Sequence, residues 1–155
     1  WPSWLMLSAV LIVLDQIVKA WIAHSFAYGD ALFVTSFFNI VHARNTGAAF
    51  SFLAGEAGWQ RFVFIGIALA AVVLIVYLLK KHQREFGFSL ALSLILGGAV
   101  GNLIDRVRLG YVIDFLDFYY AGWHFPAFNV ADSAISVGAA ILIWDSFRKK
   151  SETPQ

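Results

Sequence analysis

Four stretches of mostly apolar residues, each about 20 residues long, limit most strongly what this chain can fold into. An apolar run of that length crosses the ~30 Å hydrocarbon core of a bilayer as one helix. No water satisfies the backbone inside that core, so a spanning segment must seal its own hydrogen bonds. The sequence therefore predicts an all-α membrane protein whose four transmembrane helices cover residues 4–23, 62–79, 86–104 and 131–147.

Composition supports this class and excludes others. The chain is 60% hydrophobic and only 14% charged, whereas soluble proteins carry about 25% charged residues. A net charge of +1 leaves no basic surface for nucleic acid. Cysteine is absent, which excludes disulfides, thiolate catalysis and thiol-based zinc sites. The 155 residues fit one integral membrane domain, 1–155, without a linker or an internal repeat.

Basic residues indicate how the spans are oriented. Six of the eleven Lys and Arg residues lie in the connection 80–85 and the tail 148–150. The positive-inside rule places both segments in the cytoplasm, and four spans then place both termini there. The longer connections 24–61 and 105–130 fall on the outer side. In the first of them, residues 31–42 are rich in β-branched and aromatic residues and predict one or two strands of a small surface sheet.

Charged residues inside a span are costly and usually face the protein interior. Asp15 and Lys19 are four residues apart in the first span, so they share one helix face and can pair. They form either a neutralised structural pair or a pair in which Lys19 also contacts a substrate or lipid group.

Two other polar groups are open to more than one interpretation. Asn45-Thr-Gly47 is either a plain turn or a place where small residues let a ligand approach the backbone and the asparagine offers a donor and an acceptor. A GxxxG pattern at residues 97–101 predicts close helix packing. Asn102 and Arg106 follow it on one helix face, where Arg106 either anchors at the interface or helps Asn102 to hold a carboxylate or carbonyl.

Three carboxylates, at Asp114, Asp117 and Asp132, lie in or beside the polar-aromatic segment 110–132. Asn129 fits the N-cap of the fourth helix, which puts Asp132 at the third helical position, where an acid also stabilises the helix dipole. Two carboxylates held close share a proton, so one can activate water while the other protonates a leaving amine. Asp114 is the main candidate as partner of Asp132, and Asp117 is its rival. If this segment were a short surface helix, Asp114 and Asp117 would lie on the same side of it. If it were a strand, they would lie on opposite faces. The sequence favours neither arrangement.

These polar residues also occur as five short motifs in a fixed order along nearly the whole chain. They are Asp15-Gln16-x-x-Lys19, Asn45-Thr-Gly47-Ala-Ala-Phe50, Gly101-Asn102-x-x-Asp105-Arg106, Gly110-x-Val112-x-Asp114-Phe115 and Phe128-Asn129-x-Ala131-Asp132. In these motifs the chain resembles the lipoprotein signal peptidase (signal peptidase II) family of bacterial intramembrane aspartyl proteases. No single motif is decisive, but five in order at the family's spacing are highly specific.

The resemblance implies a fold and a site. The expected fold is four transmembrane helices with a small periplasmic sheet and a short periplasmic surface helix. The catalytic pair corresponds to Asp114 and Asp132, and Asp117 falls outside the motif. The supporting or substrate-binding residues are Asp15, Lys19, Asn45, Gly47, Asn102, Arg106, Asn129 and Ala131.

The resemblance also implies a reaction and its setting. The expected reaction removes the signal peptide from a prolipoprotein by cutting before a diacylglyceryl-modified cysteine, without a cofactor or metal. The expected location is the bacterial cytoplasmic membrane, with the active site near the outer surface. The expected partners are the prolipoprotein, membrane lipid and globomycin-type inhibitors, and a monomer is expected.

Four other interpretations compete with this one. Intramembrane acids are typical of proton-coupled transporters, although transporters place them near the midplane of broken, repeated helices. A structural or assembly protein would explain the helices but not the polar residues shared by all four spans. A metal site at His24, His42 and His124 lacks a ligand pattern, and a Ser–Lys dyad of Ser51 with Lys19 lacks a motif.

Overall fold

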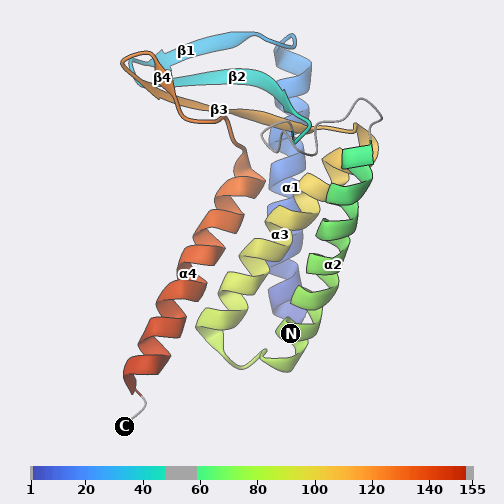
Figure 1. Cartoon of the computed structure of the whole chain (residues 1–155), viewed down its shortest axis with the longest axis vertical. Coiled ribbons are helices and arrows are strands. Elements are labelled where there is room, and N and C mark those ends of the chain that lie inside the picture. Colours follow the sequence, from blue (N-terminus) through green and yellow to red (C-terminus); the bar gives the residue numbers. More distant parts are fainter. Residues whose placement is uncertain (1, 48–58, 153–155) are drawn as a thin grey trace.

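The computed structural model describes residues 2–47 and 59–152. Its helices are α1 (Pro2–Ser25), α2 (Trp59–Lys81), α3 (Phe86–Arg108) and α4 (Val130–Glu152) (Figure 1). All four are long and apolar enough to cross a membrane, so the predicted spanning helices are confirmed. α3 and α4 continue furthest beyond the predicted apolar runs, because their polar last turns, ending at Arg108 and Glu152, remain helical.

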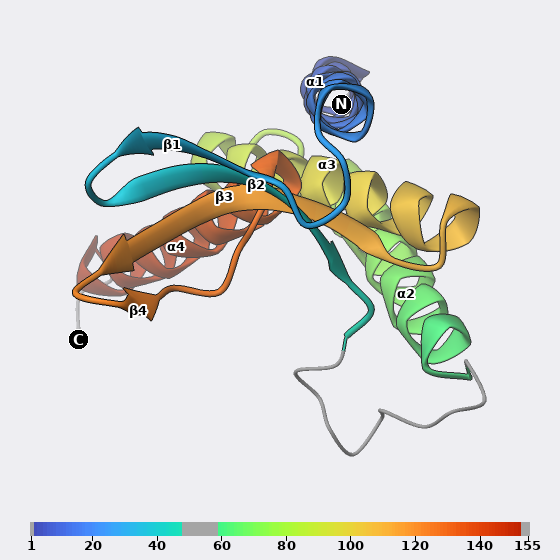
Figure 2. The same cartoon turned by 90° about the horizontal axis from the view of Figure 1, so that it is seen from above.

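A small antiparallel sheet lies across one end of the helices (Figures 1 and 2). Its strands occur in the order β1 (Ala31–Thr35), β2 (Phe38–Asn45), β3 (Val112–Tyr120) and β4 (Trp123–His124). The strands predicted within residues 31–42 are present as the β1–β2 hairpin. α1 begins and α4 ends at the end of the molecule away from the sheet (Figure 1).

One part of the expected fold has no counterpart in the described residues. The chain around Asp114 and Asp117 is strand rather than surface helix, because β3 pairs along β2. The two ranges that the structure describes contain no short surface helix, and residues 48–58 lie outside them. The last three residues of the second motif, 48–50, also lie outside the described residues.

α3 is the helix against which the other three pack. Three glycines permit the close approach, as the GxxxG pattern predicts. A Cβ on Gly97 would lie 2.9 Å from Leu11 of α1, and one on Gly98 would lie 2.3 Å from the carbonyl oxygen of Ala131 in α4. A Cβ on Gly101 would lie 2.5 Å from Oδ2 of Asp15. Backbone of α1 and α4 therefore lies directly against α3, just where these helices carry polar residues.

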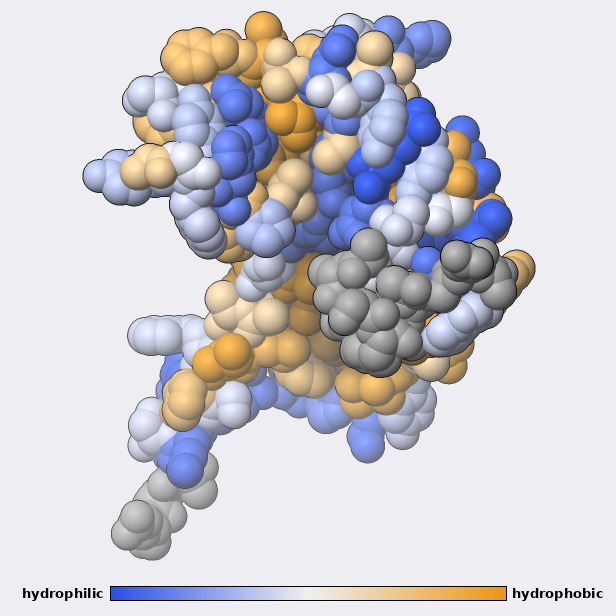
Figure 3. Space-filling model, turned by 45° about the horizontal axis from the view of Figure 1, so that its top comes forward, coloured by the Kyte–Doolittle hydropathy of each residue, from blue (hydrophilic) through white to orange (hydrophobic). Residues whose placement is uncertain are grey.

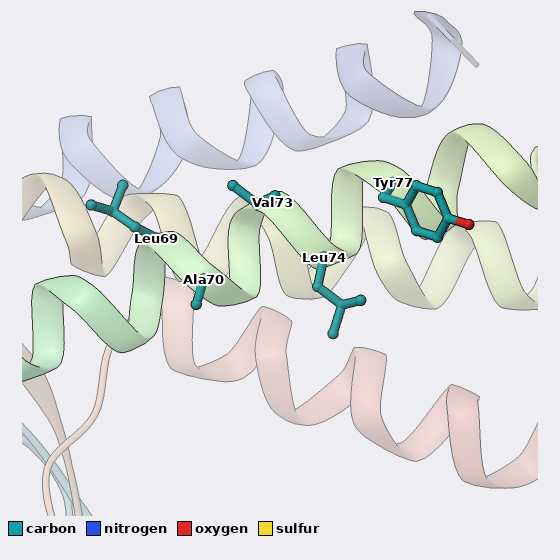
Figure 4. Close-up of a pocket in the computed structure, with 5 residues that line it drawn as sticks. All are labelled: Leu69, Ala70, Val73, Leu74 and Tyr77. Carbon is teal, nitrogen blue, oxygen red and sulfur yellow. The ribbon is translucent and has the colours of Figure 1, made fainter.

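The outer faces of the helices are apolar. Figure 3 shows mostly hydrophobic residues over the helices below the sheet, with hydrophilic residues beyond them. Along α2, side chains such as Phe62 and Val73 are 71% and 69% exposed, which suits a surface that faces hydrocarbon. A shallow groove on this face is lined by Leu69, Ala70, Val73, Leu74 and Tyr77 (Figure 4).

Candidate active site

Asp114 and Asp132 come from two different elements, a strand of the sheet and the first turn of α4. Asp114 lies in β3, opposite Ala43 of β2, and is 3% exposed. Asp132 lies in the first turn of α4 and is partly exposed. Asn129 caps that helix, since its Oδ1 accepts the backbone N–H of Asp132 at 2.8 Å and its own N–H donates to Oδ2 of Asp132 at 3.3 Å. The capping role predicted for Asn129 is therefore confirmed, and it fixes the Asp132 carboxylate at the helix end.

Two asparagines join the carboxylates in one hydrogen-bonded network. Nδ2 of Asn129 donates to Oδ1 of Asp114 at 2.9 Å and to Oδ1 of Asn102 at 3.1 Å. Nδ2 of Asn102 donates to Oδ1 of Asp132 at 2.9 Å. Each carboxylate therefore takes a hydrogen bond from an asparagine, and the two asparagines bond to each other. This network brings Asp114 and Asp132 into one site from positions eighteen residues apart in the sequence.

Lys19 and Asp15 extend the network into α1. Both side chains are fully buried and form the ion pair predicted from their spacing, with 2.8 Å between Nζ and Oδ2. Nζ also donates to Oδ1 of Asn102 at 3.0 Å. Oδ1 of Asp15 accepts the backbone N–H of Ala131 at 3.0 Å, directly before Asp132. All of these residues were expected in the site, and the structure brings them together.

Arg106, Asn45 and Gly47 border the same site. The Arg106 guanidinium interacts electrostatically with Asp132 and Asp114 and lies 5.1 Å from the centre of the Phe64 ring. Asn45 hydrogen-bonds the Asp114 side chain. Gly47 has a φ of +87°, and a Cβ there would lie 2.3 Å from Phe64, so both its backbone and its contact require glycine. Oδ1 of Asn45 accepts the N–H of Gly47 at 2.8 Å, which closes the turn that the sequence predicts.

The environment changes the acidity of Asp114. Burial raises the pKa of its carboxyl from 3.8 to about 7, and the neighbouring charge of Asp132 acts in the same direction. Hydrogen bonds from Asn45 and Asn129 and the charge of Lys19 oppose this rise in pKa. A carboxyl that keeps its proton up to neutral pH, beside a second carboxylate at a helix N-terminus, can share one proton in acid–base chemistry.

Asp117 is separated from this site. It lies in the same strand three residues after Asp114, so the two side chains point to opposite faces of the sheet. Asp117 contacts Asn39 at 3.3 Å and Nδ1 of His124 at 2.8 Å. The strand therefore places Asp114 in the network around Asp132 and Asp117 outside it.

Sequence reasoning missed Asp105 as a site residue. It is 2% exposed, lies 3.0 Å from Nζ of Lys19, and accepts the backbone N–H of Ile113 at 3.0 Å. Its only sequence signal is its place in the third motif, three residues after Asn102 and one before Arg106.

A groove of about 540 Å³ opens beside Asp132. Its walls are aromatic and apolar on the loop side and carry hydroxyls on the α4 side. The lining residues are Phe125, Pro126, Ala127, Phe128, Asp132, Ser133, Ser136 and Val137. Asp132 can therefore be reached from the surface of α4, whereas Asp114 lies behind it in the buried network. In the part of the chain that the structure describes, no cluster of three His, Cys, Asp or Glu side chains could hold a metal ion.

Comparison with known proteins gives consistent matches. A family model described as signal peptidase (SPase) II matches residues 7–148. The lipoprotein signal peptidase of Janthinobacterium sp. (strain Marseille) is 57% identical over 146 residues, which cover 94% of this chain and 88% of that protein. The lipoprotein signal peptidase of Burkholderia vietnamiensis (strain G4 / LMG 22486) is 54% identical over 146 residues, which also cover 94% of this chain and 88% of that protein.

Solved structures match the fold as well. A bacterial membrane enzyme structure determined by the in meso method at 2.3 Å resolution superposes with a TM-score of 0.87 at 32% identity, covering 99% of this chain and 93% of that one. A second, at 1.9 Å resolution, gives a TM-score of 0.83 at 34% identity and covers 93% of this chain and 92% of the other.

Proposed function

The chain belongs to the signal peptidase II family, and from this premise we propose that Asp114 and Asp132 are its catalytic pair. It is a multi-pass bacterial membrane protein and an aspartic endopeptidase that removes the signal peptide from prolipoproteins. The observation that carries the proposed assignment is the hydrogen-bonded network in which Asn129 and Asn102 hold the two carboxylates.

In the proposed reaction the pair starts with one proton, which Asp114 carries, while Asp132 is ionised. Asp132, at the N-terminus of α4, acts as the ionised base and removes a proton from the attacking water. The water oxygen adds to the carbonyl carbon of the scissile peptide bond. Asp114, whose pKa is raised to about 7, donates its own proton to the leaving amine as the C–N bond breaks. The positive charge of Arg106, which acts on both carboxylates, also favours the negative charge that develops on the carbonyl oxygen.

Supporting roles follow from the contacts. Asn102 and Asn129 orient the carboxylates, and Asp15, Lys19 and the backbone of Ala131 hold the start of α4. Asn45 bonds Asp114 from β2, while Gly47 lets the backbone after β2 approach Phe64. We assign all of these residues to substrate binding or support of the pair.

The substrate follows from the family and from the groove. The bond to be cut lies just before a cysteine that carries diacylglycerol. The groove between Phe125 and Val137 provides an apolar surface beside Asp132 that suits such a lipid-bearing peptide within the bilayer. Globomycin-type inhibitors are expected to occupy the same site, and the protein is expected to work as a monomer surrounded by lipid.

The proposed orientation places both termini in the cytoplasm and the sheet at the outer surface of the inner membrane. α1 begins and α4 ends at the same end of the molecule (Figure 1). The basic residues of 80–85 and 148–150 lie at that end, as the positive-inside rule requires of a cytoplasmic face.

Substitution of each carboxylate tests the assignment. Asp114→Asn and Asp132→Asn keep the shape of the side chain and remove its acid–base function, so each is expected to abolish cleavage of a lipidated precursor. The measurement is turnover of the purified precursor, with thermal unfolding of each variant as the control for folding. Wild-type turnover by either variant would refute the assignment.

A further inference from the structure

A buried cluster of three charges lies next to the proposed pair. It consists of Asp15, Lys19 and Asp105, whose residues are 1%, 1% and 2% exposed. Nζ of Lys19 lies 2.8 Å from Asp15 and 3.0 Å from Asp105. One carboxylate is enough to neutralise one lysine, and burying a further charge is costly. Neutralisation of Lys19 therefore explains only one of the two acids.

Each of the two acids also accepts a hydrogen bond from a backbone N–H group. Each of these N–H groups belongs to the residue directly before one member of the proposed catalytic pair. Oδ2 of Asp105 accepts from Ile113 at 3.0 Å, and Ile113 directly precedes Asp114. Oδ1 of Asp15 accepts from Ala131 at 3.0 Å, and Ala131 directly precedes Asp132. A buried N–H group requires an acceptor, and here the acceptors are the two carboxylates that Lys19 joins.

The neighbours of the cluster leave it little freedom. Nε2 of Gln16 bonds Oδ1 of Asp105 at 3.1 Å and the carbonyl of Gly101 at 3.0 Å. A Cβ on Gly101 would lie 2.5 Å from Asp15, so the space for that carboxylate depends on glycine. Lys19 also bonds Asn102, which itself bonds Asp132. The cluster is thus connected to α1, α3, β3 and α4.

From this arrangement we propose that Asp105 is a positioning residue, and that the cluster of Asp15, Lys19 and Asp105 sets the separation of Asp114 and Asp132 by holding the backbone directly before each. The inference rests on the proposed function, because it takes Asp114 and Asp132 as the catalytic pair. Asp105 acts through Ile113, and it has no direct contact with either carboxylate among the hydrogen bonds of the described residues.

Two substitutions of Asp105 separate position from charge. Asp105→Asn removes the charge but keeps the length. Its amide oxygen can still accept from both Ile113 and Lys19, while the hydrogen bond from Gln16 to Oδ1 is lost. Asp105→Glu keeps the charge but adds a methylene, which displaces the carboxylate from Ile113. We expect Asp105→Asn to keep kcat within about tenfold of wild type, the value of one weakened hydrogen bond. We expect Asp105→Glu to lower kcat about 100-fold, the cost of a misplacement of about 1 Å.

The measurement is cleavage of a synthetic diacylglyceryl-modified prolipoprotein peptide by detergent-solubilised full-length enzyme, with kcat expressed per folded molecule. KM is expected to stay unchanged for both variants, because Asp105 positions the pair rather than the substrate. If the charge of Asp105 mattered instead of its position, Asp105→Glu would be the more active variant, and that order would overturn the proposal.

Asp145 supplies the matched control. It is another buried aspartate, 5% exposed, paired at 3.2 Å with both Arg148 and Lys149 near the end of α4 far from the site. Asp145→Asn and Asp145→Glu are expected to lower the unfolding temperature without changing kcat. A purely structural Asp105 would behave in the same way, and unchanged kcat in Asp105→Glu would refute the positioning role. Turnover by Asp114→Asn would refute the catalytic assignment itself, so the two failures are distinguishable.

Discussion

Gly98→Ala tests whether the distance between α3 and α4 controls the site. A Cβ on Gly98 would lie 2.3 Å from the carbonyl oxygen of Ala131, the residue directly before Asp132. Ordinary contact requires at least about 3.4 Å, so the start of α4 must retreat by about 1 Å. A backbone atom cannot rotate away as a side chain can, and a misplacement of about 1 Å lowers a catalytic rate about 100-fold. Overpacking costs a further 1–3 kcal/mol or so of folding free energy.

The assay for Gly98→Ala is the rate of precursor cleavage per folded enzyme, read beside the unfolding temperature. We expect kcat to fall about 100-fold, because the retreat carries Asp132 away from its hydrogen bond with Asn102. Gly66→Ala in α2 is the matched control, since nothing lies within 4 Å of its Cβ position. That variant is expected to keep wild-type activity. Wild-type kcat and wild-type unfolding temperature in Gly98→Ala would refute the reasoning.

Three further predictions concern Asp117 and Asp114. Asp117→Asn is expected to retain most cleavage activity, because Asp117 contacts Asn39 and His124 rather than the pair; loss of activity in a folded variant would contradict this. Activity is expected to decline as pH rises through about 7, where Asp114 loses its proton, and a pH–rate profile with no change near that value would argue against Asp114 as the acid. The free energy of unfolding is also expected to fall as pH rises. The native state binds the Asp114 proton up to about pH 7, whereas the unfolded chain binds it only up to about pH 4. Unfolding measurements should therefore show stability falling between these pH values in wild type and falling less in Asp114→Asn.

The spanning helices and the cap of α4 could be predicted from sequence because their causes are local. A long apolar run has few alternatives in a bilayer. The reciprocal hydrogen bonds of Asn129 and Asp132 span only three residues, which makes the pattern visible in the sequence. The Asp15–Lys19 pair is equally local, since one helical turn separates them.

The choice between Asp114 and Asp117 required an element that the local sequence does not specify. Asp114 lies opposite Ala43 and Asp117 opposite Asn39, more than seventy residues earlier in the chain. Because this segment pairs with β2 as a β-strand, its two acids, three residues apart, point to opposite faces of the sheet. The surface helix that was an alternative for these residues is wrong for the same reason.

Asp105 was missed because its side-chain partners come from two other elements, α1 and β3. It meets Lys19 of α1 only because glycines let α1 approach α3, and it meets Ile113 because β3 turns back over the end of α3. A single sequence shows the acid between Asn102 and Arg106 but not its burial. Contacts between distant segments are what the local patterns do not specify.

The separation of the Asp114 and Asp132 carboxylates, measured in an experimental structure with a non-cleavable substrate-like peptide bound, tests the central claim most directly. Acid–base catalysis by the pair requires one water within about 2.6–3.2 Å of the ionised carboxylate and placed against the scissile carbonyl. The account predicts that one oxygen of each carboxylate lies within hydrogen-bonding reach of that water or of the peptide group it attacks. Carboxylates too far apart for one water and one peptide bond to lie between them would contradict it.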